Sequence, residues 1–82
     1  MEPAKLVALY LEAYFVLTGI RVNRLEDIPE KTYLFFQDMQ ADYLAHPVIL
    51  HYRRKNWSHR RISEYVGIST AKIKVLLKLH EL

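Results

Sequence analysis

The sequence contains no cysteine, only two glycines and three prolines, and no uninterrupted apolar run of membrane-spanning length. Without cysteine, the chain cannot form structural disulfides, iron–sulfur clusters or thiolate zinc sites. The longest apolar stretch, residues 6–17, is too short to cross a membrane and carries Glu12. No secretory signal is visible, so we expect a soluble cytoplasmic protein. The scarcity of glycine and proline also argues against a disordered tail or linker.

Eighty-two residues make one domain, and an apolar content of 51 % is typical of a globular chain. A domain of this size buries about 60–65 % of the surface that its unfolded chain exposes, so a monomer can fold but with marginal stability. The chain is too short for a large enzyme fold with a cleft between domains. No segment shows the alternation of a β-strand. We therefore predict an all-α fold of about five helices, in which a C-terminal three-helix unit packs on an N-terminal helical pair.

The net charge of +3 hides a difference between the two halves of the chain. Residues 1–47 contain four basic and seven acidic residues, which gives −3, whereas residues 48–82 contain eight basic and two acidic residues, which gives +6. A basic segment joined to an acidic one suggests that the C-terminal half meets a polyanion and the N-terminal half does not.

The first predicted helix runs from Pro3 to Leu17, because proline suits a first turn and Gly19 suits the position just after a helix. It is apolar nearly all round, so it must be covered on nearly all sides. We expect self-association or partner docking; the alternative is a central helix wrapped by the rest of the chain. The residues assigned to this interface are Leu6, Leu9, Tyr10, Ala13, Tyr14 and Leu17.

The second predicted helix completes the N-terminal pair, residues 1–46. Asp27 can cap its start, and it should end near His46 because Pro47 disfavours helical geometry in the preceding residue. The residues predicted to form its buried stripe are Phe36, Met39 and Tyr43.

Three shorter helices are predicted in residues 47–82. The first begins at Pro47 and continues to about Lys55, and Ser58 is a suitable N-cap for the second. The third is capped by Ser69 and continues to about His80. The residues expected to point inward from the first of these helices are Val48, Ile49 and Tyr52.

Gly67 and the residues around it match what a tight turn between two nearly perpendicular helices requires. Glycine permits a positive φ there, and Ser63, four residues earlier, is small where the helices approach closely. The apolar residues at spacings that fill the space between the helices are Ile62, Val66, Ile68, Ile73 and Leu76. Residues 60–77, RRISEYVGISTAKIKVLL, thus resemble the helix-turn-helix motif of DNA-binding proteins.

The resemblance implies binding of double-stranded DNA by a small transcriptional regulator of phage, plasmid or prokaryotic type, with a second helix in the major groove. It also implies a nucleoid-associated location and, for many such proteins, a homodimer. The residues expected to contact phosphates are Arg53, Arg54, Lys55, His59, Arg60 and Arg61. The residues expected on the recognition helix are Ser69, Thr70, Ala71, Lys72, Lys74 and Lys78.

A protein-binding role is the alternative, in which the helix pair and the apolar N-terminal helices belong to a structural or adaptor protein, such as a virion component. Its support is the apolar segment 6–17 and an outward apolar row made by Val75, Leu79 and Leu82.

Enzymatic and metal-binding roles find no support in the residue spacing. The acidic residues gather in the N-terminal half, and no nucleophile is spaced to meet a base. We therefore expect no enzyme, cofactor or metal site. The histidines, whose spacing matches no zinc pattern, are His46, His51, His59 and His80.

Overall fold

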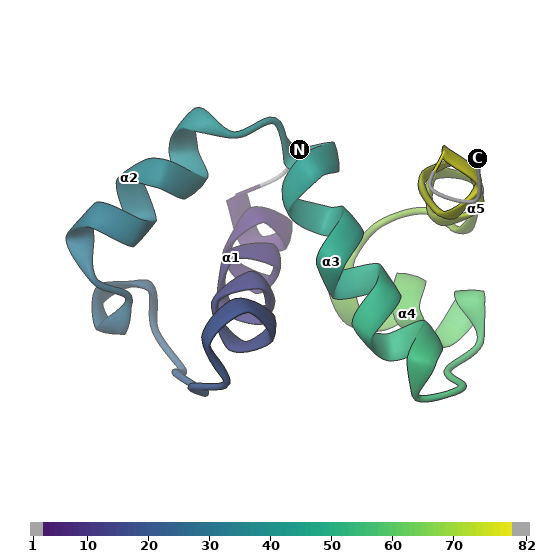
Figure 1. Cartoon of the computed structure of the whole chain (residues 1–82), viewed down its shortest axis with the longest axis horizontal. Coiled ribbons are helices and arrows are strands. Elements are labelled where there is room, and N and C mark those ends of the chain that lie inside the picture. The colour runs from purple at the N-terminus through teal and green to yellow at the C-terminus, as the bar shows by residue number, and fades with distance from the viewer. Residues whose placement is uncertain (1–2, 80–82) are drawn as a thin grey trace.

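The computed structural model describes residues 3–79, and this part of the chain is helical without any β-strand (Figure 1). The all-α prediction with five helices is confirmed. None of the helices in the described residues has both the length and the hydropathy needed to span a bilayer. The elements are α1 (Pro3–Thr18), the 3-10 helix η1 (Leu25–Asp27), α2 (Glu30–Asp38), α3 (Ala41–Arg54), α4 (His59–Val66) and α5 (Thr70–Leu79).

Helix α1 is the central element, packed on α3, α4 and η1. This is the wrapped alternative, and it explains how a helix that is apolar nearly all round stays out of water within one chain. Of the residues predicted for a dimer or partner interface, Leu6 is half-buried and Leu17 is mostly exposed. The interface prediction is wrong for the four that the chain itself covers, namely Leu9, Tyr10, Ala13 and Tyr14.

Helices α2 and α3 are separated at residues 39–40 and not at Pro47. Met39 (φ −83°, ψ 145°) and Gln40 (φ −67°, ψ 142°) have extended backbone, and α3 begins at Ala41. Pro47 therefore lies inside α3. The predicted end of the second helix near His46 is wrong, and so is the start of a separate helix at residue 47.

Burial explains why α3 continues through its proline. Pro47 removes one backbone hydrogen bond, to the carbonyl of Tyr43, and an interior proline costs a helix about 3 kcal/mol. Each large apolar side chain that is fully buried contributes about 1.5–3 kcal/mol, so two or more of them outweigh that cost. The residues that α3 buries on both sides of the proline are Leu44, Ala45, Val48, Ile49 and Tyr52.

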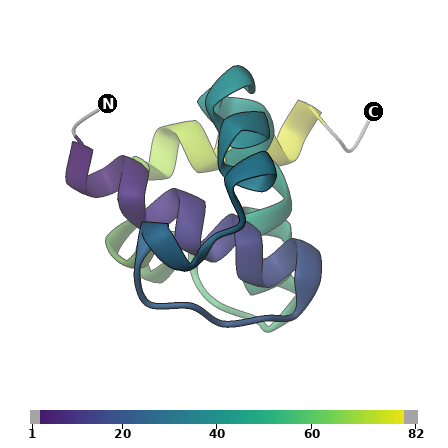
Figure 2. The same cartoon turned by 90° about the vertical axis from the view of Figure 1, so that its left-hand side faces the viewer.

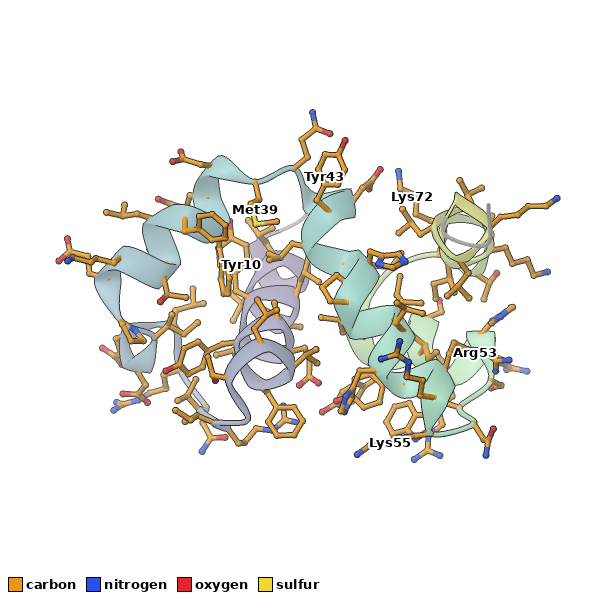
Figure 3. All side chains as sticks on the ribbon, viewed as in Figure 1. Tyr10, Met39, Tyr43, Arg53, Lys55 and Lys72 are labelled. Carbon is orange, nitrogen blue, oxygen red and sulfur yellow. The ribbon has the colours of Figure 1, made fainter. Side chains whose placement is uncertain are left out.

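The break at residues 39–40 also changes which residues of this segment face the core. Phe36 is buried as predicted and Met39 is half-buried, but the Tyr43 side chain is 68 % exposed. Tyr43 points away from α1, whereas Tyr10 points from α1 toward α2 (Figure 3). A single stripe over both segments would require one continuous helix, so the prediction for Tyr43 is wrong.

Asp27 does not cap α2. The N-cap position is taken by Pro29, which offers no side-chain acceptor. Asp27 lies in η1, where its carboxylate is 3.4 Å from Arg24 Nε.

A Schellman motif ends α3 and sets the direction in which the chain enters α4. The Asn56 N–H donates to the Arg53 carbonyl (2.9 Å) and the Trp57 N–H donates to the Tyr52 carbonyl (3.1 Å). Asn56 has a φ of 65°, a left-handed conformation that asparagine tolerates. The Trp57 and Tyr52 rings, 4.3 Å apart between centroids, supply the apolar contact that accompanies this motif.

The turn between α4 and α5 has the predicted geometry. Gly67 has a φ of 81°, and its N–H donates to the Ser63 carbonyl. The Ser58 hydroxyl accepts from the Arg61 N–H (3.1 Å) and the Ser69 hydroxyl accepts from the Lys72 N–H (3.2 Å), so both predicted N-caps are confirmed. The predicted apolar contacts between the helices are buried, at Ile62, Val66, Ile68, Ile73 and Leu76.

Glu12, on the central helix, is buried with only 6 % of its surface exposed. The hydroxyl of Tyr52 in α3 donates to one carboxylate oxygen, and the guanidinium of Arg21 donates to the other. The hydroxyl of Tyr65 in α4 donates to that second oxygen as well (3.2 Å). One carboxylate thus joins α1, α3, α4 and the segment after α1.

Candidate nucleic-acid interface

Helices α3, α4 and α5 surround a groove of about 440 Å³. A hollow of about 420 Å³ adjoins it and shares three of its residues. We refer to the two together as the basic groove. Its polar residues are Arg53, Ser58, His59, Arg60, Thr70, Lys74 and Lys78, and its apolar residues are Leu50 and Leu77.

Local structure accounts for the position of these side chains. Arg53 lies in the last turn of α3, and its guanidinium donates to the Trp57 carbonyl (2.5 Å) across the Schellman motif. His59 and Arg60 open α4 directly after the Ser58 cap. Helix α5 contributes Thr70, Lys74 and Lys78, whose spacing of four residues brings them onto one helix face. Three helices thereby direct their polar residues into one groove.

The electrostatic character of the basic groove is positive. In the described part of the chain, no carboxylate lies within ion-pair distance of Arg53, Lys74 or Lys78. Arg60 is 3.3 Å from Glu64, but both side chains are mostly exposed, and an exposed pair of this kind exchanges readily with other ions. The first turn of α4 contains no acidic residue, and neither does that of α5, so nothing offsets the positive helix N-termini.

The structure separates the other predicted phosphate contacts from the groove. The Arg61 guanidinium lies 3.7 Å from the centre of the Trp57 ring, a cation–π arrangement outside the groove lining. Arg54 and Lys55 are exposed but do not line the groove either. The five arginines and lysines among the predicted phosphate contacts therefore divide, because Arg53 and Arg60 line the groove and the other three do not.

The predicted recognition helix is exposed along the face that carries Thr70, Lys74 and Lys78, and Ala71 is exposed beside it. Lys72 projects from α5 toward the start of α3 (Figure 3), and its ammonium lies 3.0 Å from the Asp42 carboxylate. The Ser69 hydroxyl acts as the cap of α5. The residues predicted for the recognition helix therefore include some that line the groove and others, Ser69 and Lys72, whose side chains have contacts elsewhere.

The apolar row predicted on α5 is described only at its first position. Val75 is exposed, and the Leu79 side chain and Leu82 lie outside the described residues. His80, where the helix was predicted to end, lies outside them too.

Leu50 and Leu77, which form the apolar part of the basic groove, were missed by the sequence analysis. Leu50 lies three residues before Arg53, a spacing that places both on one face of a continuous α3. The predicted helix from Pro47 to about Lys55 already contained both residues, so the same periodicity could have found Leu50.

His51 lies at the other side of α3, against α1. Its ring makes edge-to-face contacts with Phe15 and Tyr52, with centroid distances of 5.7 and 4.9 Å. Burial lowers the pKa of His51, and the nearby positive charges of Lys55 and Arg21 lower it further. Within the described residues no group of three or more histidine, cysteine or acidic side chains is arranged to hold a metal ion.

Comparison with known proteins finds no family model, no curated protein sequence and no solved structure that matches this chain. The function is therefore argued from the residues and geometry described above.

Proposed function

We propose that this protein binds double-stranded DNA through the basic groove and the exposed face of α5. The observation that carries the proposal is the convergence of cations from three helices on one groove, where Arg53, Lys74 and Lys78 have no carboxylate partner among the described residues and Arg60 has only the exposed Glu64. Cations held together with so little counter-charge are explained by an anionic ligand, because their mutual repulsion destabilises the isolated protein.

The arrangement of α4 and α5 supports a helix-turn-helix mode of binding. The glycine turn and the two serine caps expose the first turns of both helices. Thr70, Lys74 and Lys78 on α5 are suited to the major groove, while Arg53 and Arg60 are suited to the phosphates beside it. The described part of α5 carries no Arg, Asn or Gln, the side chains that read bases by paired hydrogen bonds. We therefore expect the protein to act as a small transcriptional regulator with modest sequence specificity.

Two matched double variants test the role of the groove. Arg60→Ala with Lys74→Ala removes two positive charges from the groove, and Arg54→Ala with Lys55→Ala removes two from outside it. Fluorescence anisotropy with a duplex of random sequence measures the affinity of each. We expect the groove variant to bind at least about tenfold more weakly and its log–log salt slope to be shallower by about 1.8, because two phosphate contacts are lost.

The control variant has the same net charge as the groove variant but leaves the groove intact, so it should retain most of the wild-type affinity. Equal loss in both variants would mean that overall charge and not the groove determines binding. An absence of binding by the wild type at low salt would contradict the proposal.

The alternative role, a structural or adaptor protein, is supported by exposed apolar side chains such as Val75 on α5. In that case the protein should not bind duplex DNA in a salt-dependent way, and the groove variant should match the control.

A further inference from the structure

Helix α2 is held to the rest of the molecule by few side chains. Phe36 is its one fully buried residue among those described. Its ring lies 5.7 Å from the Tyr10 ring of α1, and the Tyr33 ring lies at the same centroid distance from Tyr10. Figure 2 faces this end of the molecule and shows α2 on the near side with no helix in front of it. Helices α4 and α5 lie at the other end of the long axis (Figure 1).

The uncovered face of α2 carries a stripe of four exposed residues, Lys31, Leu34, Phe35 and Asp38. Their spacing of i, i+3, i+4 and i+7 places them on one helix face. Leu34 is 50 % exposed and Phe35 is 58 % exposed. Lys31 and Asp38 have no ion-pair partner among the described residues. The stripe is therefore an apolar centre with one positive and one negative end.

The order of the two charges is unfavourable for α2 alone. Lys31 lies in the first turn, near the positive end of the helix dipole, and Asp38 is the last residue, near the negative end. A second helix lying antiparallel on this face would bring its negative end to Lys31 and its positive end to Asp38. Both unfavourable placements then become favourable contacts.

We propose that α2 is the contact surface of a homodimer, in which a second copy of the chain places its own α2 antiparallel on this stripe. A two-fold axis between Leu34 and Phe35 sets Leu34 against the partner's Phe35. The same axis sets Lys31 against the partner's Asp38, because both pairs are centred on that point. Any other partner must supply this charge order itself, whereas a second copy has it, and a two-fold contact closes without forming fibres.

This dimer does not depend on DNA binding. Because α2 lies at the end of the molecule remote from α4 and α5, the contact leaves the basic groove open in both copies. Self-association and DNA binding can therefore be measured separately, and the failure of one leaves the other intact.

Sedimentation velocity over micromolar to millimolar concentrations, without DNA, tests the apolar centre. The wild type should shift from monomer to dimer, and Leu34→Glu with Phe35→Glu should remain monomeric. The matched control is Leu17→Glu with Ile20→Glu, which changes side chains that are 56 % and 53 % exposed, one in the last turn of α1 and one just after it. The control should dimerise like the wild type, and all variants should keep the wild-type circular dichroism and bind DNA.

Charge reversal tests the antiparallel register. Lys31→Asp alone or Asp38→Lys alone converts two attractive contacts into two repulsive ones, so each should weaken dimerisation about tenfold. The variant with both reversals should dimerise like the wild type, and an equimolar mixture of the two single variants should form heterodimers. The proposal is overturned if the wild type stays monomeric, if the Leu17 and Ile20 control abolishes association, or if the double reversal fails to restore it.

Discussion

A carboxylate removed from water needs hydrogen-bond donors in place of its hydration shell, and Glu12 has three of them. Burial raises the pKa of Tyr52, and its hydrogen bond to Glu12 raises it further, so the phenol remains the donor across the physiological range. The three donors come from different segments of the chain. This one residue therefore fixes the position of α1 relative to both α3 and α4.

Replacing Glu12 with alanine should lower the free energy of unfolding by about 2 kcal/mol, because the buried Tyr52 hydroxyl loses its acceptor and the more exposed Arg21 loses its ion-pair partner. Urea denaturation followed by circular dichroism measures the change. Glu26→Ala, which removes an exposed partner of Arg24, is the control and should cost less than about 0.5 kcal/mol. Similar losses in the two variants would show that the hydrogen bonds to buried Glu12 stabilise the fold no more than an exposed ion pair does.

His51 should make the stability depend on pH below neutrality. Its pKa in the folded protein is lowered from the ordinary value of 6.5 by burial and by Lys55, Arg21 and Arg54, with Glu12 acting in the opposite direction. The unfolded chain then binds a proton at this histidine more readily than the folded one. The contribution of neutral His51 to stability is therefore complete above about pH 6.5 and is lost as the pH falls below that value.

The variant His51→Phe keeps an aromatic ring against Phe15 and Tyr52 but cannot be protonated. Urea unfolding measured between about pH 7 and pH 5 should give a flatter pH dependence than the wild type, in which the free energy of unfolding falls. Carboxylates titrate in both proteins, so the difference between the two curves reports His51. Parallel curves would contradict the assignment.

Among the elements, α3 contributes most to the organisation of the molecule, because it contacts α1 on one side and α4 and α5 on the other. It continues through Pro47, and its end supplies both Arg53 and the Schellman motif that directs α4. A break at residue 46 would uncouple these features from Leu44 and Ala45, which α3 buries before the proline.

Pro47→Ala should raise the free energy of unfolding by about 1–3 kcal/mol. The alanine restores an N–H that can donate to the Tyr43 carbonyl and removes the clash of the ring with the preceding turn. The greater freedom of the unfolded chain reduces the gain. Chemical denaturation of the two proteins at one pH gives the difference, and a loss of stability in the variant would mean that packing of the ring outweighs the backbone cost.

At the scale of the whole molecule, the body measures 32 × 23 × 22 Å, and the central helix α1 belongs to the acidic half of the sequence. Helix α2 lies at one end of the long axis, and α4 and α5 lie at the other (Figure 1). The acidic residues of η1 and α2 are therefore kept away from a polyanion bound at α4 and α5, whereas Asp42 lies beside α5, paired with Lys72.

The structure also changes the expected salt dependence of DNA binding. Four permanently charged side chains line the basic groove, Arg53, Arg60, Lys74 and Lys78. Four phosphate contacts correspond to a log–log slope of about −3.6, whereas the five arginines and lysines predicted from the sequence to contact phosphates correspond to about −4.5. Anisotropy titrations at several salt concentrations distinguish these values. A wild-type slope of about −4.5 that becomes shallower in the Arg54→Ala, Lys55→Ala variant would show that phosphates are also contacted outside the groove.

Local signals in the sequence determined most of the C-terminal half. The serine caps, the positive φ of Gly67 and the apolar spacing around it depend on neighbouring residues alone, so they were predictable. The helical class followed from periodicity in the same way.

Tertiary packing decided the rest: the continuation of α3 through Pro47, the burial of Glu12, the covering of α1 within one chain, and the division of the cations between the groove and Trp57. Each of these depends on residues distant in the sequence, because a local cost such as an interior proline or a buried charge is offset only by contacts that the folded chain supplies.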